Sequence, residues 1–248
     1  MNYGKSNLSR RKKQISSKKK RKKKRVGVRF FKALIICFLL LIVIGAAGIG
    51  IYVKKVIDNT PEVTAKDIMP QGYTTNIVDS NGTLLEQLKD SDSNRVYKKY
   101  DEISPYMGKA FVAIEDERFY KHNGIDIRGI MRAMAENIKT MSFSQGASTL
   151  TQQVLKNEVL EREKSLSRKI KEQYLAVSLE NALKKQLGSK DAAKKYILEL
   201  YLNTIPLHHG LRGVEAAAQY YYGKHASELT LAEAASIAGI TKTPSLYA

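Results

Sequence analysis

The chain has almost no cysteine, since Cys37 is the only one among 248 residues. Cys37 lies inside a long apolar run, so the remainder holds no disulfide bond and no thiolate metal site. A domain outside that run must therefore rely on a conventional hydrophobic core, and about 190 residues are enough to build one.

Acidic residues are absent from the beginning of the chain, where no Asp or Glu precedes Asp58. Of the 42 Lys and Arg residues, 15 lie in residues 1–32, which leaves 27 against 24 acids elsewhere. The net charge of +18 therefore describes a basic tail joined to a nearly balanced remainder, and it requires no nucleic-acid partner. Such a tail cannot form a core, so we expect it to be disordered and to contact anionic lipid headgroups.

Charge is also absent from residues 33–53, ALIICFLLLIVIGAAGIGIYV. As a helix rising about 1.5 Å per residue, this run is long enough to cross a hydrocarbon core of roughly 30 Å. A signal peptide is the alternative, but its apolar region usually has about 7–15 residues and precedes a small-residue cleavage site. We therefore expect a retained, single transmembrane helix. The basic run at residues 18–25 favours a cytoplasmic N-terminus and a domain on the outer face of the cell membrane.

Residues 54–70 are expected to form a stalk, and residues 71–248 a mainly α-helical domain. Apolar and polar residues alternate around Ser80-Asn81-Gly82, which predicts a small β-hairpin because Asn-Gly suits a tight turn. Beyond Ser104-Pro105 apolar residues recur at helical spacing, and no internal repeat is present.

The stretch IEDERFYKHNG places acids directly after the apolar run AFVAI. On a helix, Glu115, Phe119 and His122 would share one face. Apolar neighbours partly desolvate the Glu115 carboxylate, which favours proton uptake by a general base. A solvated acidic patch near a helix end is the alternative.

A second stretch, QGASTLTQQVLKN, is dense in hydroxyl and amide side chains. A Ser or Thr here would ordinarily cap a helix. However, Gly146 and Ser148 leading into a helix would also offer backbone N–H groups to an anion, and Lys156 lies near the same face as the glutamines. The composition suits sugar hydroxyls and phosphates together.

A third stretch, SRKIKEQ, contains Arg168, Lys169 and Glu172. Arg168 and Glu172 stand at i and i+4, so a surface ion pair is the simplest interpretation. Alternatively, Arg168 and Lys169 would hold a diphosphate, and Glu172 would supply the second acid that glycosyl chemistry commonly uses.

Together these stretches resemble the peptidoglycan glycosyltransferases, glycosyltransferase family 51, over roughly residues 70–248. The motifs E-D-x-x-F-x-x-H-x-G, G-x-S-T-x-T-Q-Q, R-K-x-x-E and K-x-x-I-L-E-x-Y-L-N occur in the family's order, followed by RGVEAAA and YYGK. The chain is similar to the N-terminal half of a class A penicillin-binding protein, or to a monofunctional transglycosylase. Ala147 and Tyr222 are mild departures from the family's usual residues.

The resemblance implies a lysozyme-like, mainly α-helical fold that polymerises lipid II into glycan strands, with inversion and release of undecaprenyl diphosphate. Glu115 matches the general base, and Lys156 and Arg168 match residues that hold the donor diphosphate. Glu172 matches the second acid, either for positioning or as a ligand of a divalent cation (Mg²⁺ or Mn²⁺). No organic cofactor is expected. The remaining residues expected in the cleft or its loop are Asp116, Phe119, His122, Ser148, Thr149, Gln152, Gln153 and Lys169. Glu199, Tyr201 and Asn203 are expected to be structural.

The substrate's polyprenyl tail stays in lipid, so we expect an apolar surface near the membrane, within Phe111 and Met131–Phe143 and including Met134 and Met141. Core packing is the alternative for these residues. Cell-wall synthesis and division proteins are expected partners.

The chain carries no plausible S-x-x-K, S-x-N and K-T-G set, so we expect no penicillin-sensitive transpeptidase chemistry in it. It stops at TPSLYA, where the family resembled here usually continues with more helix, so we expect a truncated piece of a longer bifunctional protein. Two other functions remain open, a lysozyme-like murein hydrolase or lytic transglycosylase and a non-catalytic membrane scaffold. The hydrolase is disfavoured because cutting a polymer needs no diphosphate site.

Overall fold

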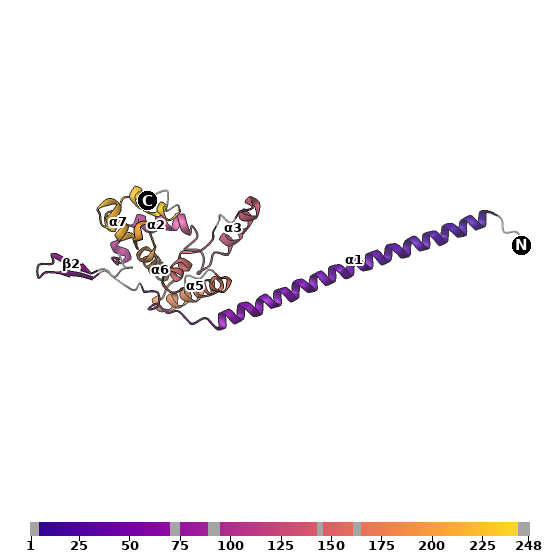
Figure 1. Ribbon diagram of the computed structural model, residues 1–248, viewed down its shortest axis with the longest axis horizontal. Coiled ribbons are helices and arrows are strands. Elements are labelled where there is room, and N and C mark those ends of the chain that lie inside the picture. The colour runs from indigo at the N-terminus through magenta and orange to yellow at the C-terminus, as the bar shows by residue number, and fades with distance from the viewer. Residues whose placement is uncertain (1–4, 70–74, 89–94, 143–145, 161–164, 243–248) are drawn as a thin grey trace. The chain divides into compact units, whose positions relative to one another are not determined.

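The computed structural model describes residues 5–69, 75–88, 95–142, 146–160 and 165–242. The chain divides into two units, Met1–Asp58 and Asn59–Ala248. The first unit is built on one continuous helix, α1 (Lys5–Asp58), and its part Val28–Asp58 is long and apolar enough to cross a membrane (Figure 1).

The start and the end of α1 both differ from our expectations. The disorder expected for the tail is wrong for residues 5–32, which are helical. Lys and Arg have good intrinsic helix propensity, which explains why a charged stretch can extend an apolar helix. Residues 54–58 also continue the helix into the expected stalk.

A two-stranded antiparallel hairpin opens the second unit, as predicted. Strand β1 (Thr75–Val78) pairs with β2 (Leu84–Leu88). The turn is fixed by Asp79, whose carboxylate accepts the backbone N–H groups of Asn81 and Thr83, both at 2.8 Å. Gly82 supplies the left-handed conformation that the turn requires, with φ of +83°.

The rest of the second unit is helical, which confirms the predicted mainly α class. Its α-helices are α2 (Pro105–Glu115), α3 (Ile127–Thr140), α4 (Leu150–Glu158), α5 (Leu166–Leu187), α6 (Lys190–Thr204), α7 (Val214–Tyr222) and α8 (Leu231–Ile240). Short 3₁₀ turns lie at η1 (Tyr100–Glu102), η2 (His208–Gly210) and η3 (Ala226–Glu228).

Helix α6 lies in the core, because its apolar residues surround the helix instead of forming one stripe. It packs against α4 and α5, while α2 lies along α8. The structural roles expected in α6 agree with its contacts. The Glu199 carboxylate accepts the hydroxyl of Tyr97 at 2.5 Å and the N–H of Tyr100 at 2.7 Å. Tyr201 is fully buried, and Asn203 accepts a backbone N–H at 2.8 Å.

Gly124 brings the loop after α2 close to α5. Its φ is +83°, and a Cβ at this position would lie 2.4 Å from the carbonyl oxygen of Ala176. The Thr149 hydroxyl donates to the Gly124 carbonyl at 2.6 Å, so the start of α4 is attached to the same loop. Only glycine permits this approach, which places the end of α2 beside α4.

Candidate active site

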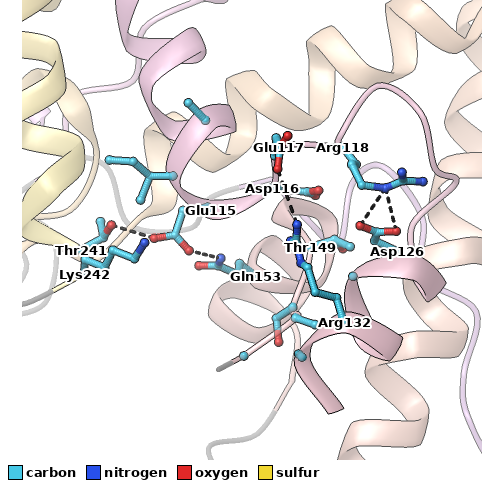
Figure 2. A pocket seen from close by; sticks show the side chains of 17 residues that line it. Glu115, Asp116, Glu117, Arg118, Asp126, Arg132, Thr149, Gln153, Thr241 and Lys242 are labelled. Atoms are coloured by element: carbon cyan, nitrogen blue, oxygen red, sulfur yellow. Dashed lines mark hydrogen bonds and ion pairs between the residues drawn. The ribbon is translucent and has the colours of Figure 1, made fainter. Parts of the chain in front are cut away.

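Glu115 is the last residue of α2, and the structure holds both of its carboxylate oxygens. Gln153 Nε2 donates to Oε2 at 2.8 Å, and the Thr241 hydroxyl lies 2.7 Å from Oε1 (Figure 2). The side chain is partly buried. The expectation that Glu115 shares one helix face with Phe119 and His122 is wrong, because α2 ends at Glu115 and Asp116 has non-helical dihedral angles.

Asp116 and His122 form a buried pair behind Glu115. The imidazole Nε2 lies 2.9 Å from both Asp116 oxygens, and Asp116 also accepts the N–H of Leu150 at 3.1 Å. Phe119 is fully buried beneath the ammonium of Lys194, which lies 4.3 Å from the ring centroid. Phe119 and His122 therefore shape the loop from within the core, and neither lines the cavities beside Glu115.

Glu115 stands in the wall between two cavities, of about 470 Å³ and about 370 Å³. The residues that line both are Glu115, Gln153 and Thr241. The shared wall is thus the carboxylate together with its two hydrogen-bond partners. A group bound in either cavity would meet the same carboxylate, which is the arrangement that proton transfer between two bound reactants needs.

The first cavity is lined by charges of both signs. Arg118 Nε donates to Asp126 at 3.1 Å, and Arg132 lies 3.7 Å from Glu117 (Figure 2). Burial raises the pKa of Asp126, but hydrogen bonds from Gly129 N–H and Arg118 outweigh it and leave the pKa below its ordinary value. Asp126 is therefore a stable counter-ion for Arg118.

The second cavity has both polar and apolar residues in its lining. The polar ones include Lys156, Asn157 and His208, and the apolar ones include Ile205, Leu207 and Ile240. The predicted placement of Lys156 near Gln153 agrees with this lining. The basic and amide groups suit an anionic ligand with attached polar groups.

Some of the hydroxyl and amide residues at the start of α4 line the cleft, and others are buried within the fold. Ser148 and Thr149 line the first cavity. Gln152 is buried instead, and its side chain accepts the Thr149 N–H at 2.8 Å in a capping box, so its expected place in the cleft is wrong. The N–H groups of Thr149 and Leu150 have protein acceptors, so an anion at the start of this helix would have to be bound by other N–H groups, and the predicted role of Gly146 and Ser148 stays a prediction.

Arg168, Lys169 and Glu172 form an ion cluster on α5. Arg168 Nη1 donates to Glu172 at 2.9 Å, and Lys169 donates to both Glu172 and the Ser148 hydroxyl. Glu172 is buried, and none of the three cluster residues lines either cavity. The i, i+4 ion pair is therefore the observed geometry, and Lys169 connects it to Ser148 at the cleft.

The carboxylate of Glu172 is paired with the two cations Arg168 and Lys169. Within the parts of the chain that the structure describes, no group of three His, Cys, Asp or Glu side chains is arranged to hold a metal ion. A role for Glu172 as a ligand of a divalent cation stays a prediction.

The outer face of α3 is apolar and exposed. Its members recur at i, i+4, i+7, i+11 and i+14, and they are Ile127, Met131, Met134, Ile138 and Met141. Met131 and Met134 belong to the surface predicted from the sequence. Phe111 does not, because it is fully buried in the core against Tyr201. Phe143 lies outside the described residues.

Fold and site together define a mainly α-helical, lysozyme-like domain whose cleft presents one carboxylate between two polar cavities. The Transglycosylase family profile matches residues 81–248, and the chain belongs to this family of glycosyltransferases.

Penicillin-binding protein 1A of Clostridium perfringens (strain 13) is 42% identical over 223 residues, covering 88% of this chain and 31% of that protein. Penicillin-binding protein 1A of Escherichia coli K12 is 43% identical, covering 89% of this chain and 24% of that protein. The protein of the same name from Aquifex aeolicus is 38% identical, covering 87% and 28%. The chain thus spans about a quarter to a third of the length of these relatives.

Six polar or charged residues at the first cavity have no role in the sequence-based prediction: Glu117, Arg118, Asp126, Arg132, Thr241 and Lys242. Arg118 lies inside the motif E-D-x-x-F-x-x-H-x-G, so this motif could have indicated Arg118 as a candidate cleft residue. Thr241 and Lys242 reach the site only through the packing of α8 on α2, for which the sequence has no local signal.

Proposed function

We propose that this domain polymerises lipid II into glycan strands. Glu115 takes the proton of the acceptor sugar's 4-hydroxyl, and that oxygen forms a bond to the anomeric carbon of the growing chain. The bond from this carbon to the diphosphate oxygen breaks with inversion, and undecaprenyl diphosphate leaves with the electron pair. The proton remains on Glu115 until it is released to solvent.

One observation carries this proposal, namely that Glu115 and its two hydrogen-bond partners form the wall shared by two cavities. A polymerase needs two sugars bound on either side of one base, whereas a binding module or scaffold has no such need. Lys156 in the second cavity supports diphosphate binding on that side. Arg168 and Lys169 would join it once the diphosphate competes with Glu172 for these two cations.

A divalent cation, if the reaction uses one, would be bound by the diphosphate oxygens, and Glu172 would be open to it only after Arg168 and Lys169 move to the diphosphate.

For the whole chain we propose a cell-membrane protein with its N-terminus in the cytoplasm and the domain on the outer face. The exposed apolar face of α3 suits insertion into the lipid boundary, where the polyprenyl tail of the substrate resides. Partners from cell-wall synthesis and division belong to the same proposal.

The direct test is polymerisation of fluorescent lipid II by the full chain in detergent, resolved on a gel, with and without EDTA. We expect long glycan ladders from the parent and at least a hundredfold less product from Glu115→Gln, because an amide cannot take the proton. Glu228→Gln, an exposed acid outside the cleft, is the matched control and should polymerise as the parent does. Short fragments released from preformed glycan would indicate a hydrolase instead. Equal product from the parent and Glu115→Gln would overturn the assignment of the base.

A further inference from the structure

Thr241 is the C-terminal cap of α8, and this helix lies along α2. Its hydroxyl lies 2.7 Å from Glu115 Oε1 and 2.8 Å from the carbonyl oxygen of Ala238. A hydroxyl has one proton to donate. Only one of these two oxygens can therefore receive that proton at any moment.

We propose that Thr241 is a positioning residue that follows the protonation state of Glu115, an inference that rests on the proposed function. While Glu115 is ionised, its carboxylate is the stronger acceptor and receives the Thr241 proton. After Glu115 takes a proton from the acceptor sugar, the Thr241 hydroxyl turns its own proton to Ala238 O and accepts the new O–H of Glu115. No proton is gained or lost in this exchange.

The two hydrogen-bond partners of Glu115 differ in whether they can accept a hydrogen bond as well as donate one. Gln153 Nε2 can only donate, and it donates more strongly to the ionised carboxylate than to the neutral acid. Thr241 both donates and accepts, and it therefore holds Oε1 in one place before and after proton transfer. Fixed geometry at a general base lowers the cost of the chemical step, because the base need not reorganise as its charge changes.

Other charged and titratable groups lie around Glu115, most of them in the lining of the same two cavities. The basic ones in the two cavities are Arg118, Arg132, Lys156 and Lys242. The others are Asp116, Glu117, Asp126, His208 and, from α6, Tyr201. Burial raises the pKa of Tyr201, and the negative charge of Glu115 raises it further, so Tyr201 stays neutral. Among the described residues, the hydrogen bonds of Glu115 go to Gln153 and Thr241.

The test compares Thr241→Val, Thr241→Ser and the parent by the rate of lipid II polymerisation across pH. Valine has the same shape without a hydroxyl, so we expect kcat to fall about tenfold with KM unchanged, since a hydrogen bond to a charged group is lost. The acid limb of the kcat/KM profile should move to higher pH, because an ionised base that loses a donor takes up a proton more readily. Serine should restore both.

Thr204→Val is the matched control, since the buried Thr204 hydroxyl bonds the carbonyl three residues earlier, as Thr241 does, but touches no carboxylate. It should keep the parent's kcat and pH profile, and thermal unfolding should show all variants folded. Parental kcat and pH profile in Thr241→Val would overturn the inference, as would a change in KM alone or a serine variant that stays impaired. Loss of activity in Glu115→Gln tests the base separately, so a failed role for Thr241 leaves the proposed function standing.

Discussion

Glu215 is a buried carboxylate in the first turn of α7, with a side chain 1% exposed. It accepts hydrogen bonds from His225 Nδ1 at 2.7 Å and Ala226 N at 2.8 Å. Burial raises the pKa of Glu215, but these donors, with Lys98 and Gln219, lower it more, so the pKa lies below its ordinary value of 4.5. The pair of donors therefore stabilises the fold only while Glu215 is ionised.

A carboxylate whose pKa is lowered by folding contributes stability above its unfolded pKa, and this is lost as pH falls through the folded value. We expect the parent's free energy of unfolding to fall as pH drops below 4.5, and Glu215→Gln to lack that part of the dependence. At neutral pH the variant should be less stable by roughly 1–3 kcal/mol, because buried donors lose a charged acceptor. Urea unfolding followed by circular dichroism measures both. Parallel pH curves for the two proteins would contradict the assignment, and Glu62→Gln, at an exposed acid before the hairpin, is the control.

At the residue scale, the sequence can indicate a candidate site residue only where a pattern in that residue's own segment points to the site. Glu115 was a candidate because it directly follows an apolar run and opens the motif E-D-x-x-F-x-x-H-x-G, and the role of general base came from the family resemblance. Gln152 and Gln153 could not be told apart, since which amide caps α4 and which faces the cleft depends on where that helix begins. Thr241 stands 126 residues from Glu115, and no pattern in its own segment points to the site.

Within the helical domain, α3 carries a stripe of apolar residues that faces outward. Ile127, Met131 and Ile138 are each more than 60% exposed, and the residues buried on this helix, Gly129 and Ala133, are small. Water-exposed apolar faces of this kind mark membrane or partner surfaces. Helical periodicity predicted that α3 exists, but it could not say which face the core would leave uncovered.

We expect this face to enter the lipid boundary when the full chain is reconstituted in nanodiscs. In a Cys37→Ser background, an environment-sensitive fluorophore on Met134→Cys should show blue-shifted emission and quenching by lipid-borne quenchers. The same fluorophore on Leu231→Cys, an exposed apolar position at the start of α8, is the control and should report water. Equal emission from the two sites would exclude lipid insertion of α3.

Two predictions about secondary structure were wrong for the same reason, because a local sequence pattern does not show what the neighbouring segments do. Residues 115–122 carry an i, i+4, i+7 pattern, yet α2 ends at Glu115, because Asp116 turns inward to bind His122 and the start of α4. The basic tail has the composition of a disordered segment, yet residues 5–32 continue α1. In both cases the outcome depends on what the neighbouring segment does.

At the scale of the whole molecule, the chain joins an apolar anchor to a helical domain whose proposed substrate carries a lipid tail. The direction in which α1 crosses the membrane decides on which side of the membrane the domain lies. Residues 1–32 hold 15 basic residues and no acid, whereas only Lys54 and Lys55 closely follow the apolar run. Basic segments flanking a membrane helix remain in the cytoplasm, so this asymmetry favours a domain on the outer face.

Single cysteines in the Cys37→Ser background test this orientation in intact bacterial cells. A membrane-impermeant maleimide should label Ser227→Cys, on the exposed surface of η3, and should reach Ser17→Cys only after permeabilisation. Replacing the basic residues of 18–25 with Gln should give chains of both orientations, because the remaining charges of the tail are then closer in number to those after the helix. Labelling of Ser17→Cys in intact cells of the parent would place the domain inside. Glu115 would then be separated from an acceptor strand growing outside, and the proposed polymerisation could not take place there.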